Sequence, residues 1–329
     1  MSYNTPDAAV SPKPAVRHVA VTDNEVGQRL DNWLLKALKG VPRSRVYRLL
    51  RKGEVRVNGK RARPEQRVAL GDDVRLPPVR TPAELPPPRV PDTLTAEIEA
   101  SIVHQDADVL VLAKPAGLAV HGGSGLSFGV IEALRASRPN ETLELAHRLD
   151  RDTSGLLIVA RNRKALTTLH RLLREGQVEK RYLALVKGPW NLGQKTIAVP
   201  LAIRARLGGE RVVRVDALGK HADSTFTPVE FYGPRASLLA VQIGTGRTHQ
   251  IRVHAAHAGH PVAGDDKYGD REFNASLREL GLNRMFLHAQ ALSFEWPSGK
   301  TFAVSCPLPA ELATVLERLA ASGGKRRRR

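Results

Sequence analysis

A proline-rich stretch between residues 77 and 91 constrains this chain more than any other feature of its sequence. It holds seven prolines, among them the run Pro86-Pro87-Pro88. Proline fixes one backbone dihedral angle and lacks an amide hydrogen, so this stretch cannot form a helix or a central strand and extends as a semi-rigid spacer. It therefore separates two domains. The boundaries that we expect are a flexible start at 1–17, a small domain at 18–80, a linker at 81–97, a larger domain at 98–322 and a basic tail at 323–329.

The positive charge of the chain is concentrated at its two ends. The formal net charge is +18, and 17 Lys and Arg stand against 8 Asp and Glu in residues 1–80. Five more positive charges come from the tail Lys325 to Arg329. Charge needed only for solubility would be spread more evenly, so a polyanion is the first partner to consider.

Two helices and a hairpin are predicted in the small domain. Apolar residues recur at helical spacing over residues 30–38. A second helix is predicted after Pro42, with Ser44 as its cap and Gly53 as its stop. Asn58-Gly59 then supplies the two positive φ angles of a type I′ turn between short strands.

The second of these helices carries a basic face. Arg45, Arg48 and Lys52 are spaced so that they share one face, distinct from the apolar stripe of the helix. A solvated surface would explain an isolated stripe of this kind, but this one belongs to a small and strongly basic domain. The order of a helix, an arginine-rich helix and a hairpin over residues 27–76 resembles the RNA-binding module named after small-subunit ribosomal protein four. The residues that we expect to bind RNA in this domain are Arg43, Arg45, Arg48, Lys52 and Lys60.

The larger domain is predicted to contain more strands than helices. A buried strand is indicated at 108–113 and a helix at 164–174, where leucines recur with helical spacing. Thr248 is the predicted cap of a helix that ends at Gly259. Further strands are expected at 181–187, 224–232, 237–243, 286–294 and 301–305. Many of them are joined by hairpin-length turns, so we expect an α+β protein with a mixed, largely antiparallel sheet and flanking helices.

The sequence gives no indication of a membrane or secreted protein. No apolar stretch approaches the roughly 20 residues that a membrane-spanning helix requires. Residues 1–14 lack the basic-then-apolar order of a signal peptide. We therefore expect a cytoplasmic protein. Cys306 is the only cysteine, which excludes an intramolecular disulfide.

Residues 147–155, HRLDRDTSG, set Asp150 and Asp152 beside arginines. A neighbouring guanidinium favours the charged form of a carboxylate, which suits a nucleophile or a base better than a general acid. The two aspartates lie two residues apart, and we expect only one of them to react, without a paired-carboxylate mechanism. The alternative is a turn whose aspartates only cap the backbone, because Asp, Thr, Ser and Gly are typical turn residues.

The same nine residues resemble the central motif of the pseudouridine synthases that act on large-subunit ribosomal RNA and some transfer RNAs. KRYLALV at 180–186 and GRTHQIRVH at 246–254 are similar to the next two motifs of this family, in the same order and at similar spacing. Segments 112–135 and 259–273 are similar as well, so the resemblance spans essentially the whole chain. It implies the pseudouridine synthase fold and an isomerase that converts uridine to pseudouridine in large-subunit ribosomal RNA.

The resemblance also implies roles for single residues. Asp150, not Asp152, matches the catalytic aspartate of the family, whose members flip the uridine out of the RNA, cleave its glycosidic bond and rejoin the uracil through carbon 5. Tyr182 matches an aromatic residue that stacks on the base and could take the proton from carbon 5, with a core tyrosine as the alternative. The basic partner of the aspartate matches Arg252, with Arg247 as the alternative, and Arg148 and Arg247 are expected to bind RNA.

Arg148 resembles the residue that, in relatives, fills the space left by the flipped base. A phosphate contact or a salt bridge to Asp152 is the alternative. The aspartate either attacks the anomeric carbon or removes a ribose 2′ proton, and both mechanisms stay open. The implied partner is large-subunit ribosomal RNA, free or within a precursor particle, and we expect the protein to act as a monomer.

No metal and no cofactor are expected. The histidines near residue 250 suggest a metal site, but no cysteine or clearly placed carboxylate completes one. An isomerisation needs neither a redox group nor a group donor. Two other classes remain open: an RNA-binding assembly factor without catalysis, and an aspartate-dependent hydrolase, for which we find no second acid at a suitable distance. The histidines in question are His249, His254, His257 and His260.

Overall fold

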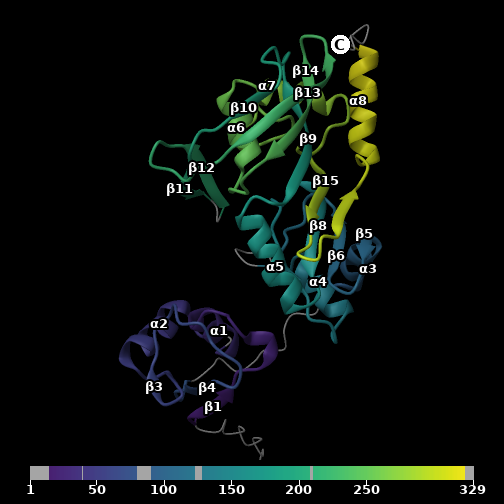
Figure 1. Cartoon of the computed structure of the whole chain (residues 1–329). Helices are drawn as coiled ribbons and strands as arrows, with labels where there is room; N and C mark the ends of the chain where they lie inside the picture. Colours follow the sequence, from purple (N-terminus) through teal and green to yellow (C-terminus); the bar gives the residue numbers. More distant parts are fainter. Residues whose placement is uncertain (1–14, 39, 80–89, 123–127, 208–209, 323–329) are drawn as a thin grey trace, which may run out of the picture. The chain divides into compact units, whose positions relative to one another are not determined.

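The chain folds into two compact units, Met1–Arg89 and Val90–Arg329, called here the N-terminal unit and the C-terminal unit (Figure 1). The expected start of the chain up to residue 14, most of the expected linker and the basic tail lie outside the described residues. In the part that is described, none of the helices combines the length and the apolar character that a membrane span requires. The structure is a computed structural model that describes residues 15–38, 40–79, 90–122, 128–207 and 210–322.

The N-terminal unit is a small sheet packed against two helices. Its strands lie in the order β1-β4-β2-β3. Trp33 and Leu34 from the first helix and Val46 and Leu50 from the second are buried against this sheet and form the core of the unit. The elements are β1 (Arg17–Ala20), the short 3-10 helix η1 (Asp23–Glu25), α1 (Leu30–Ala37), α2 (Arg43–Lys52), β2 (Arg56–Val57), β3 (Lys60–Arg61) and β4 (Asp73–Leu76).

Local sequence signals account for the turns of this unit. Gly53 ends α2 in the left-handed conformation with a φ of 70°, as expected. Asn58 and Gly59, with φ of 49° and 75°, form the turn between β2 and β3, which confirms the Asn-Gly prediction. The predicted cap of α2 is wrong, because Pro42 precedes the first turn and Ser44 lies inside the helix. Proline already fixes the φ that the cap position adopts here, −57°.

Two expected boundaries also differ from the structure. Arg17, expected in the flexible start, lies in β1. Residues 92–97, expected in the linker, begin helix α3 (Asp92–Ala100). Pro91 occupies the cap of α3, where its missing amide hydrogen costs nothing, and the aspartate that follows is favourable at the positive end of a helix. Ile98 is fully buried, which fixes α3 to the core of the C-terminal unit.

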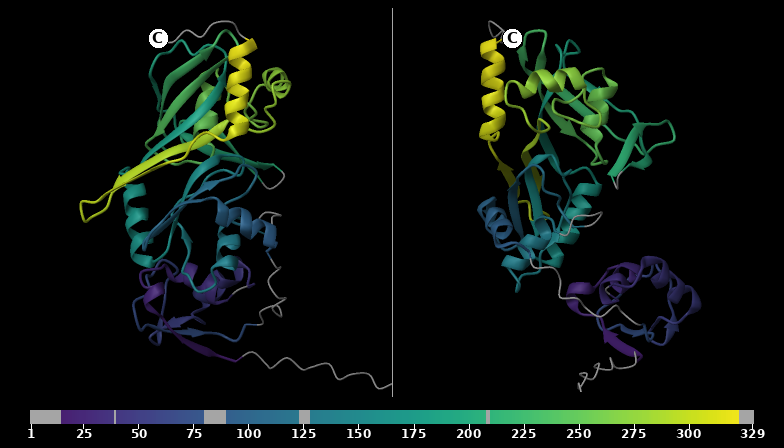
Figure 2. Two further views of the ribbon diagram at one scale, coloured as in Figure 1. Left: turned by 90° about the vertical axis from the view of Figure 1, so that its right-hand side faces the viewer. Right: turned by 180° about the vertical axis from the view of Figure 1, so that it is seen from behind.

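The C-terminal unit is built on one ten-stranded sheet with helices on both faces (Figures 1 and 2). The strand order is β10-β13-β14-β9-β15-β8-β6-β5, with β16 paired to β15 and β7 paired to β8, while β11 and β12 form a separate hairpin. The remaining helices are α4 (Val130–Ser137), α5 (Arg163–Arg174), α6 (Gln250–His257), α7 (Arg271–Arg278) and α8 (Ala310–Ser322).

The pairing within this sheet is mixed and largely antiparallel, as expected. Only β15 and β8 run parallel, and the other pairs in the described part of the sheet are antiparallel. The expected strands are β6, β9, β13, β14, β15 and β16, with bounds that agree within two residues. The strands are β5 (Ile102–Gln105), β6 (Val109–Lys114), β7 (Glu144–Leu145), β8 (Ser154–Ala160), β9 (Glu179–Lys187), β10 (Lys195–Ile197), β11 (Leu201–Leu207), β12 (Glu210–Val215), β13 (Ser224–Tyr232), β14 (Ala236–Ile243), β15 (Leu287–Glu295) and β16 (Thr301–Ser305).

Alternation along β9 directs its side chains to two different layers. Tyr182, Ala184 and Val186 pack in the cluster that contains α4 and α6, whereas Leu183 and Leu185 pack with α7 and α8 on the opposite face. Figure 2 shows α8 lying along that opposite face. The period of two in a strand therefore separates the layer that carries Tyr182 from the layer closed by the C-terminal helix.

Gly155 is required where β8 meets β15. Its φ is 108°, and a Cβ at this position would lie 2.2 Å from the carbonyl oxygen of Ala289. Only glycine fits both the dihedral angle and the space. The close approach allows β15 to lie between β8 and β9.

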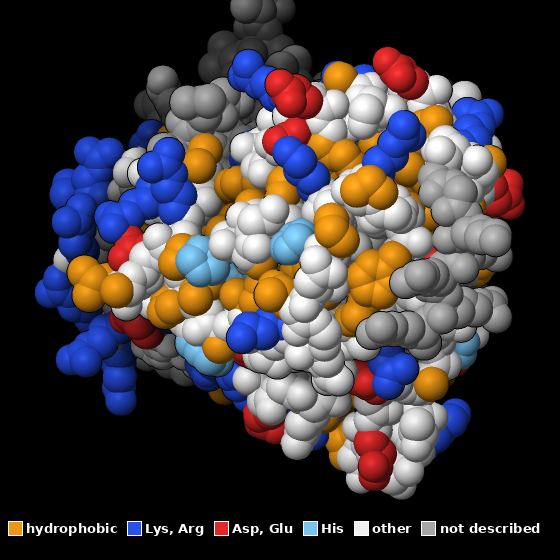
Figure 3. Space-filling view, turned by 90° about the horizontal axis from the view of Figure 1, so that it is seen from above, with side chains coloured by type: hydrophobic (Ala, Val, Ile, Leu, Met, Phe, Trp, Pro, Cys, Tyr) orange, Lys and Arg blue, Asp and Glu red, His pale blue; other side chains and the backbone are white. Residues whose placement is uncertain are grey.

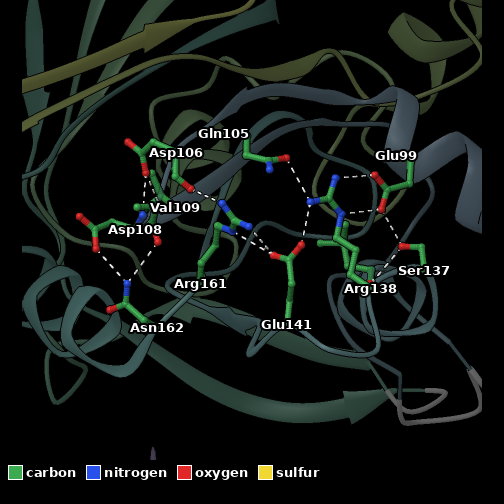
Figure 4. Close-up of polar contacts among 12 residues, drawn as sticks. Glu99, Gln105, Asp106, Asp108, Val109, Ser137, Arg138, Glu141, Arg161 and Asn162 are labelled. Atoms are coloured by element: carbon green, nitrogen blue, oxygen red, sulfur yellow. Dashed lines mark hydrogen bonds and ion pairs between the residues drawn. The ribbon is translucent and has the colours of Figure 1, made fainter.

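A polar network joins α3, the end of α4, β5 and the residues between β8 and α5 (Figure 4). Arg138 binds both carboxylate oxygens of Glu99, at 2.8 and 2.7 Å, and also contacts Glu141 at 3.2 Å. Glu141 in turn accepts a bond of 2.9 Å from Arg161, whose guanidinium also donates to the carbonyl of Asp106. Networked, partly buried ion pairs of this kind hold loop segments in place better than isolated surface pairs do.

Candidate active site

Three separated parts of the chain form one pocket in the C-terminal unit, called here the Asp150 pocket. Asp150 comes from the turn before β8, Tyr182 from β9 and Arg252 from α6. Arg148 and Arg247 line the same pocket. The structure therefore brings together all the residues of the C-terminal unit that the sequence indicated for the site.

Asp150 and Arg252 are in contact at the wall of this pocket. The Arg252 Nη1 lies 3.4 Å from the Asp150 Oδ2, and the side chains are 8% and 18% exposed. The distance is long for a charge-assisted hydrogen bond, so the carboxylate is oriented by Arg252 without being fully engaged by it. Asp150 thus keeps lone pairs available to a ligand in the pocket.

The stronger partner of Arg252 is Asp265, to which the sequence analysis assigned no role. Arg252 binds it through Nε at 2.7 Å and Nη2 at 2.8 Å, a bidentate pair that fixes the guanidinium plane. Asp265 also accepts bonds from the backbone amides of Lys267 and Tyr268. The Tyr268 ring lies against the guanidinium, 5.1 Å from its carbon. Arg252 is therefore held on three sides.

The charges of this pair are stabilised against burial. Burial alone would lower the pKa of Arg252, but its hydrogen bonds to Asp265 and the charge of Asp150 hold that pKa above its usual value. Burial would likewise raise the pKa of Asp265, and the bonds from Arg252 lower it below the usual range. Both groups stay ionised, so a permanent positive charge faces Asp150.

Tyr182 lies deep in the pocket and is 7% exposed. It is held in the middle of the sheet, opposite Val241 on β14 and Ala289 on β15. Burial, and then the negative charge of Asp150, raise the pKa of Tyr182. The side chain is therefore a neutral phenol near pH 7, which favours a ring that stacks over one that acts as a phenolate base.

The arginines next to Asp150 have different positions. Arg148 is exposed at the pocket, while Arg151 contacts Asp152 at 3.1 Å. The alternative of an Arg148–Asp152 salt bridge is not what the structure shows. The segment is a turn, closed by the Thr153 amide on the Asp150 carbonyl at 3.2 Å, and not extended. The two carboxylates nevertheless line different cavities.

Arg247, the alternative partner of the aspartate, is fastened elsewhere. Its Nε donates to the carbonyl of His221 at 3.0 Å. The loop that carries it is held by the buried Gln250, whose Oε1 accepts from the Arg247 amide and from the Thr245 hydroxyl. The predicted cap Thr248 is wrong, because His249 occupies the cap of α6 with a φ of 54°. This strained backbone was not evident in the sequence.

Lys114 supports the turn that carries Asp150, and the sequence analysis did not identify it. Its buried Nζ donates to three carbonyl oxygens, those of Pro115, Leu118 and Arg151, at 2.7, 2.8 and 2.9 Å. Burial lowers the pKa of Lys114 to about 7, with the charges of Asp152 and Asp150 acting against this. The three carbonyl acceptors also favour the charged ammonium, which uses all its donors here.

The histidines considered as metal ligands have separate partners. His249 contacts the Tyr268 hydroxyl, His254 contacts Ser224 and the Val199 carbonyl, and His260 contacts the Lys187 carbonyl. Within the described residues, no group of three or more His, Cys, Asp or Glu side chains could hold a metal ion.

The basic residues expected to bind RNA lie on the surface of the N-terminal unit. Arg43, Arg45, Arg48 and Lys52 are exposed on α2, and Lys60 is exposed on β3. Lys52 makes one loose ion pair, 3.9 Å from Glu54. Figure 3 shows one face of the molecule, on which hydrophobic side chains gather around histidines in the middle, with Lys and Arg side chains both among and around them.

Comparison with known proteins agrees with these features. A family model described as RNA pseudouridylate synthase matches residues 108–257, and one described as the S4 domain matches residues 28–74. The chain is 52% identical over 312 residues to ribosomal large subunit pseudouridine synthase C of Escherichia coli, covering 93% of this chain and 97% of that protein. It is 50% identical over 309 residues to the protein of the same name from Haemophilus ducreyi, covering 93% and 96%.

Solved structures show the same fold over about two thirds of the chain. Human RNA pseudouridylate synthase domain containing 4 is 26% identical with a TM-score of 0.58, covering 69% of this chain and 95% of that chain. Human RNA pseudouridylate synthase domain containing 1 is 29% identical with a TM-score of 0.54, covering 67% and 94%. With a homologue 52% identical over almost its full length, this chain belongs to the RNA pseudouridylate synthase family.

Proposed function

We propose that this protein converts specific uridines of large-subunit ribosomal RNA to pseudouridine, with Asp150 as the catalytic carboxylate. One observation carries the proposal: the Asp150 carboxylate faces a pocket beside the buried Tyr182 ring and a permanently charged Arg252. The substrate class is that named for the relatives of about 50% identity.

The proposed reaction exchanges one bond for another within a single nucleotide. The bond between the ribose and nitrogen 1 of uracil breaks, the free base turns, and a bond from the ribose to carbon 5 forms while carbon 5 loses its proton to nitrogen 1 or to solvent. The composition of the nucleotide is unchanged, so no oxidant, reductant or group donor is consumed. For that reason we propose neither a cofactor nor a metal.

Asp150 would act on the ribose of a nucleotide whose base has left the helical stack. Attack on the anomeric carbon and removal of the 2′ proton both require an unprotonated carboxylate with a free lone pair. The loose 3.4 Å contact with Arg252 orients the carboxylate and leaves it acceptor capacity for the ribose.

Tyr182 and Arg148 would hold the RNA around the reacting nucleotide. The Tyr182 ring would stack on the extruded uracil, an interaction worth roughly 1–3 kcal/mol per base. The exposed Arg148 would enter the space that the base leaves, which offsets part of the few kcal/mol that flipping costs. Proton removal from carbon 5 by Tyr182 would require a base that accepts the phenol proton in turn.

The N-terminal unit would add affinity for the RNA without acting on the uridine. Its exposed arginines and lysines suit phosphate contacts, which position a protein on RNA without reading the bases. The substrate would be met in the cytoplasm, either as free ribosomal RNA or within a precursor particle, by one copy of the protein.

The test is a map of pseudouridines in large-subunit ribosomal RNA from cells with and without this protein. We expect specific sites to disappear without the protein and to return with the wild-type chain but not with Asp150→Asn. The purified variant should still bind the RNA within a few-fold of the wild type. An unchanged map would contradict the proposal. Modification restored by Asp150→Asn would instead show that another group reacts.

A further inference from the structure

A second cavity lies next to the Asp150 pocket, at the base of the β11–β12 hairpin. It has a volume of about 470 Å³ and is called here the hairpin pocket. Gly246, Arg247 and Thr248 line both cavities, so one short wall separates them. The hairpin itself stands apart from the main sheet (Figures 1 and 2).

The floor of the hairpin pocket is aliphatic. Leu201 and Val213 are buried, whereas Ile203 is 52% and Leu218 is 96% exposed. A leucine that is almost completely exposed beside an open cavity presents apolar surface that a flat, weakly polar ligand could cover. Single exposed apolar residues are common on protein surfaces, but this apolar patch lies next to the Asp150 pocket, where a ligand could contact it.

The rim of the hairpin pocket is cationic. Lys220 and Arg247 are exposed at its edge. The guanidinium of Arg247 is oriented by the bond from its Nε to the His221 carbonyl, which leaves its two terminal nitrogens for other acceptors. Apolar floor and cationic rim together suit a nucleotide, whose base has two apolar faces and whose phosphates carry the negative charge.

The wall between the cavities is rigid. Gln250 is 3% exposed and binds Thr245 and Arg247 through its oxygen, and its nitrogen donates to the carbonyl of Asp223 at 2.7 Å and to Ser224 at 3.1 Å. The spacing of the two cavities is therefore set by the fold and does not depend on a bound ligand. An RNA strand with one nucleotide in the Asp150 pocket would place the adjacent nucleotide beside this wall.

We propose that the hairpin pocket is a subsite for the base of an unpaired nucleotide adjacent to the target uridine. The base lies on Leu218 and Ile203, and Lys220 and Arg247 contact the flanking phosphates. This inference rests on the proposed function, since it requires an RNA substrate in the Asp150 pocket. On this proposal, the β11–β12 hairpin recognises the RNA sequence next to the target uridine.

Leu218→Asp tests the apolar floor. With an unmodified transcript of large-subunit ribosomal RNA, we expect its KM to rise at least ten-fold while kcat stays within two-fold of the wild type. Leu192→Asp is the matched control, because Leu192 is also an exposed leucine, 46% exposed, in the segment before β10, and it should match the wild type. Lys220→Glu and the exposed control Lys195→Glu test the rim in the same way. Equal unfolding midpoints would show that the variants are folded.

The decisive experiment combines a change in the protein with the removal of single bases from the RNA. In oligonucleotides that carry a mapped target uridine, each neighbouring nucleotide is replaced in turn by an abasic one. For the wild type, we expect one neighbour whose loss lowers kcat/KM at least ten-fold. The same abasic RNA should cost Leu218→Asp less than two-fold, because the contact is already absent.

The outcomes separate the two proposals. A wild-type protein that modifies no uridine, either in the transcript or in precursor particles from cells that lack it, would overturn the proposed function and the subsite with it. An active wild type whose abasic and Leu218→Asp effects simply multiply would overturn the subsite alone. So would wild-type kinetics of Leu218→Asp on naked RNA, which would point instead to a protein that covers Leu218.

Discussion

Arg252 and Asp265 form a buried bidentate ion pair, with contacts of 2.7 and 2.8 Å, and the same guanidinium lies 3.4 Å from the Asp150 carboxylate. We expect Asp265→Asn to lower kcat at least a hundred-fold and to leave KM for RNA within a few-fold, because Arg252 loses the orientation that directs it to Asp150. Asp266→Asn is the control, since that side chain is 87% exposed and makes only a 3.4 Å contact with Arg278. Equal kinetics of the two variants would show that Asp265 has no positioning role.

The ring of Tyr182 and its hydroxyl can be tested separately. Tyr182→Phe keeps the ring, so we expect RNA affinity within about three-fold of the wild type. Tyr182→Ala should weaken binding by roughly 5- to 150-fold, the equivalent of about 1–3 kcal/mol of stacking. Tyr232→Ala controls for loss of a buried tyrosine on the other face of the sheet, and affinity should not respond to it. Equal binding by Tyr182→Ala and the wild type would exclude stacking. The measurement is a titration of RNA at fixed salt.

The basic face of α2 should appear in the salt dependence of RNA binding. In the full chain, changing both Arg45 and Arg48 to Gln removes two exposed charges and should reduce the slope of log K against log salt by about 1–2. The paired control changes Lys195 and Lys300, which are exposed on the C-terminal unit, to Gln. If both pairs change the slope equally, the N-terminal unit has no special part in binding phosphate.

Gly155→Ala should be far more damaging than another glycine substitution at positive φ. The new Cβ would lie 2.2 Å from the Ala289 oxygen, so β15 could not approach β8. We expect the loss of several kcal/mol of unfolding free energy or no folded protein. Gly176→Ala has a φ of 72° and no atom within 4 Å of the new Cβ, and it should cost only about 1 kcal/mol. Chemical denaturation of both variants measures the difference in their unfolding free energies. That difference would vanish if the strain of a positive φ alone decided the loss of stability.

His147 should make the fold sensitive to acid. Burial, and then the charge of Lys180, lower the pKa of His147 from 6.5 to about 4. The unfolded chain therefore binds a proton near pH 6.5 that the folded chain accepts only near pH 4, so stability is lost as the pH falls through this window. We expect this residue to contribute a loss of roughly 1–3 kcal/mol.

The check for His147 is urea denaturation at pH 7, 6, 5 and 4. His147→Gln should show a smaller dependence of unfolding free energy on pH, by up to one proton, and its slope should otherwise match the wild type. Burial also lowers the pKa of His249, His254 and His288, so the variant retains part of the effect. Identical slopes would show that His147 is protonated equally in both states.

Local signals in the sequence predicted local structure well. The Asn58-Gly59 turn and the stop of α2 at Gly53 follow from dihedral preferences of single residues, and α5 follows from leucine spacing. The helix caps were predicted less well. Pro42 caps α2, where Ser44 was expected, and His249 caps α6, where Thr248 was expected. A cap depends on the backbone conformation at one residue, and flanking side chains specify it weakly.

The site was predicted only as far as residue types and motifs reveal it. Asp150, Tyr182 and Arg252 do meet in one pocket, and their catalytic roles remain predictions. Asp265 and Lys114 were missed because their function depends on contacts across the fold. Asp265 lies in a segment, GDDKYG, that reads as an ordinary turn, and a lysine at the end of a strand gives no sign that three carbonyls surround it.

The position of β15 also determines when the enzyme becomes competent during its synthesis. β8 and β9 follow each other along the chain, yet they are joined in the sheet only by β15, which begins at Leu287. When only the first 280 residues have left the ribosome, Asp150, Tyr182 and Arg252 are already present. The edges of β8 and β9 that pair with β15 are then still open. We therefore expect the nascent chain to stay inactive until β15 has emerged, and a chain that ends before Leu287 to carry Asp150, Tyr182 and Arg252 without a formed site.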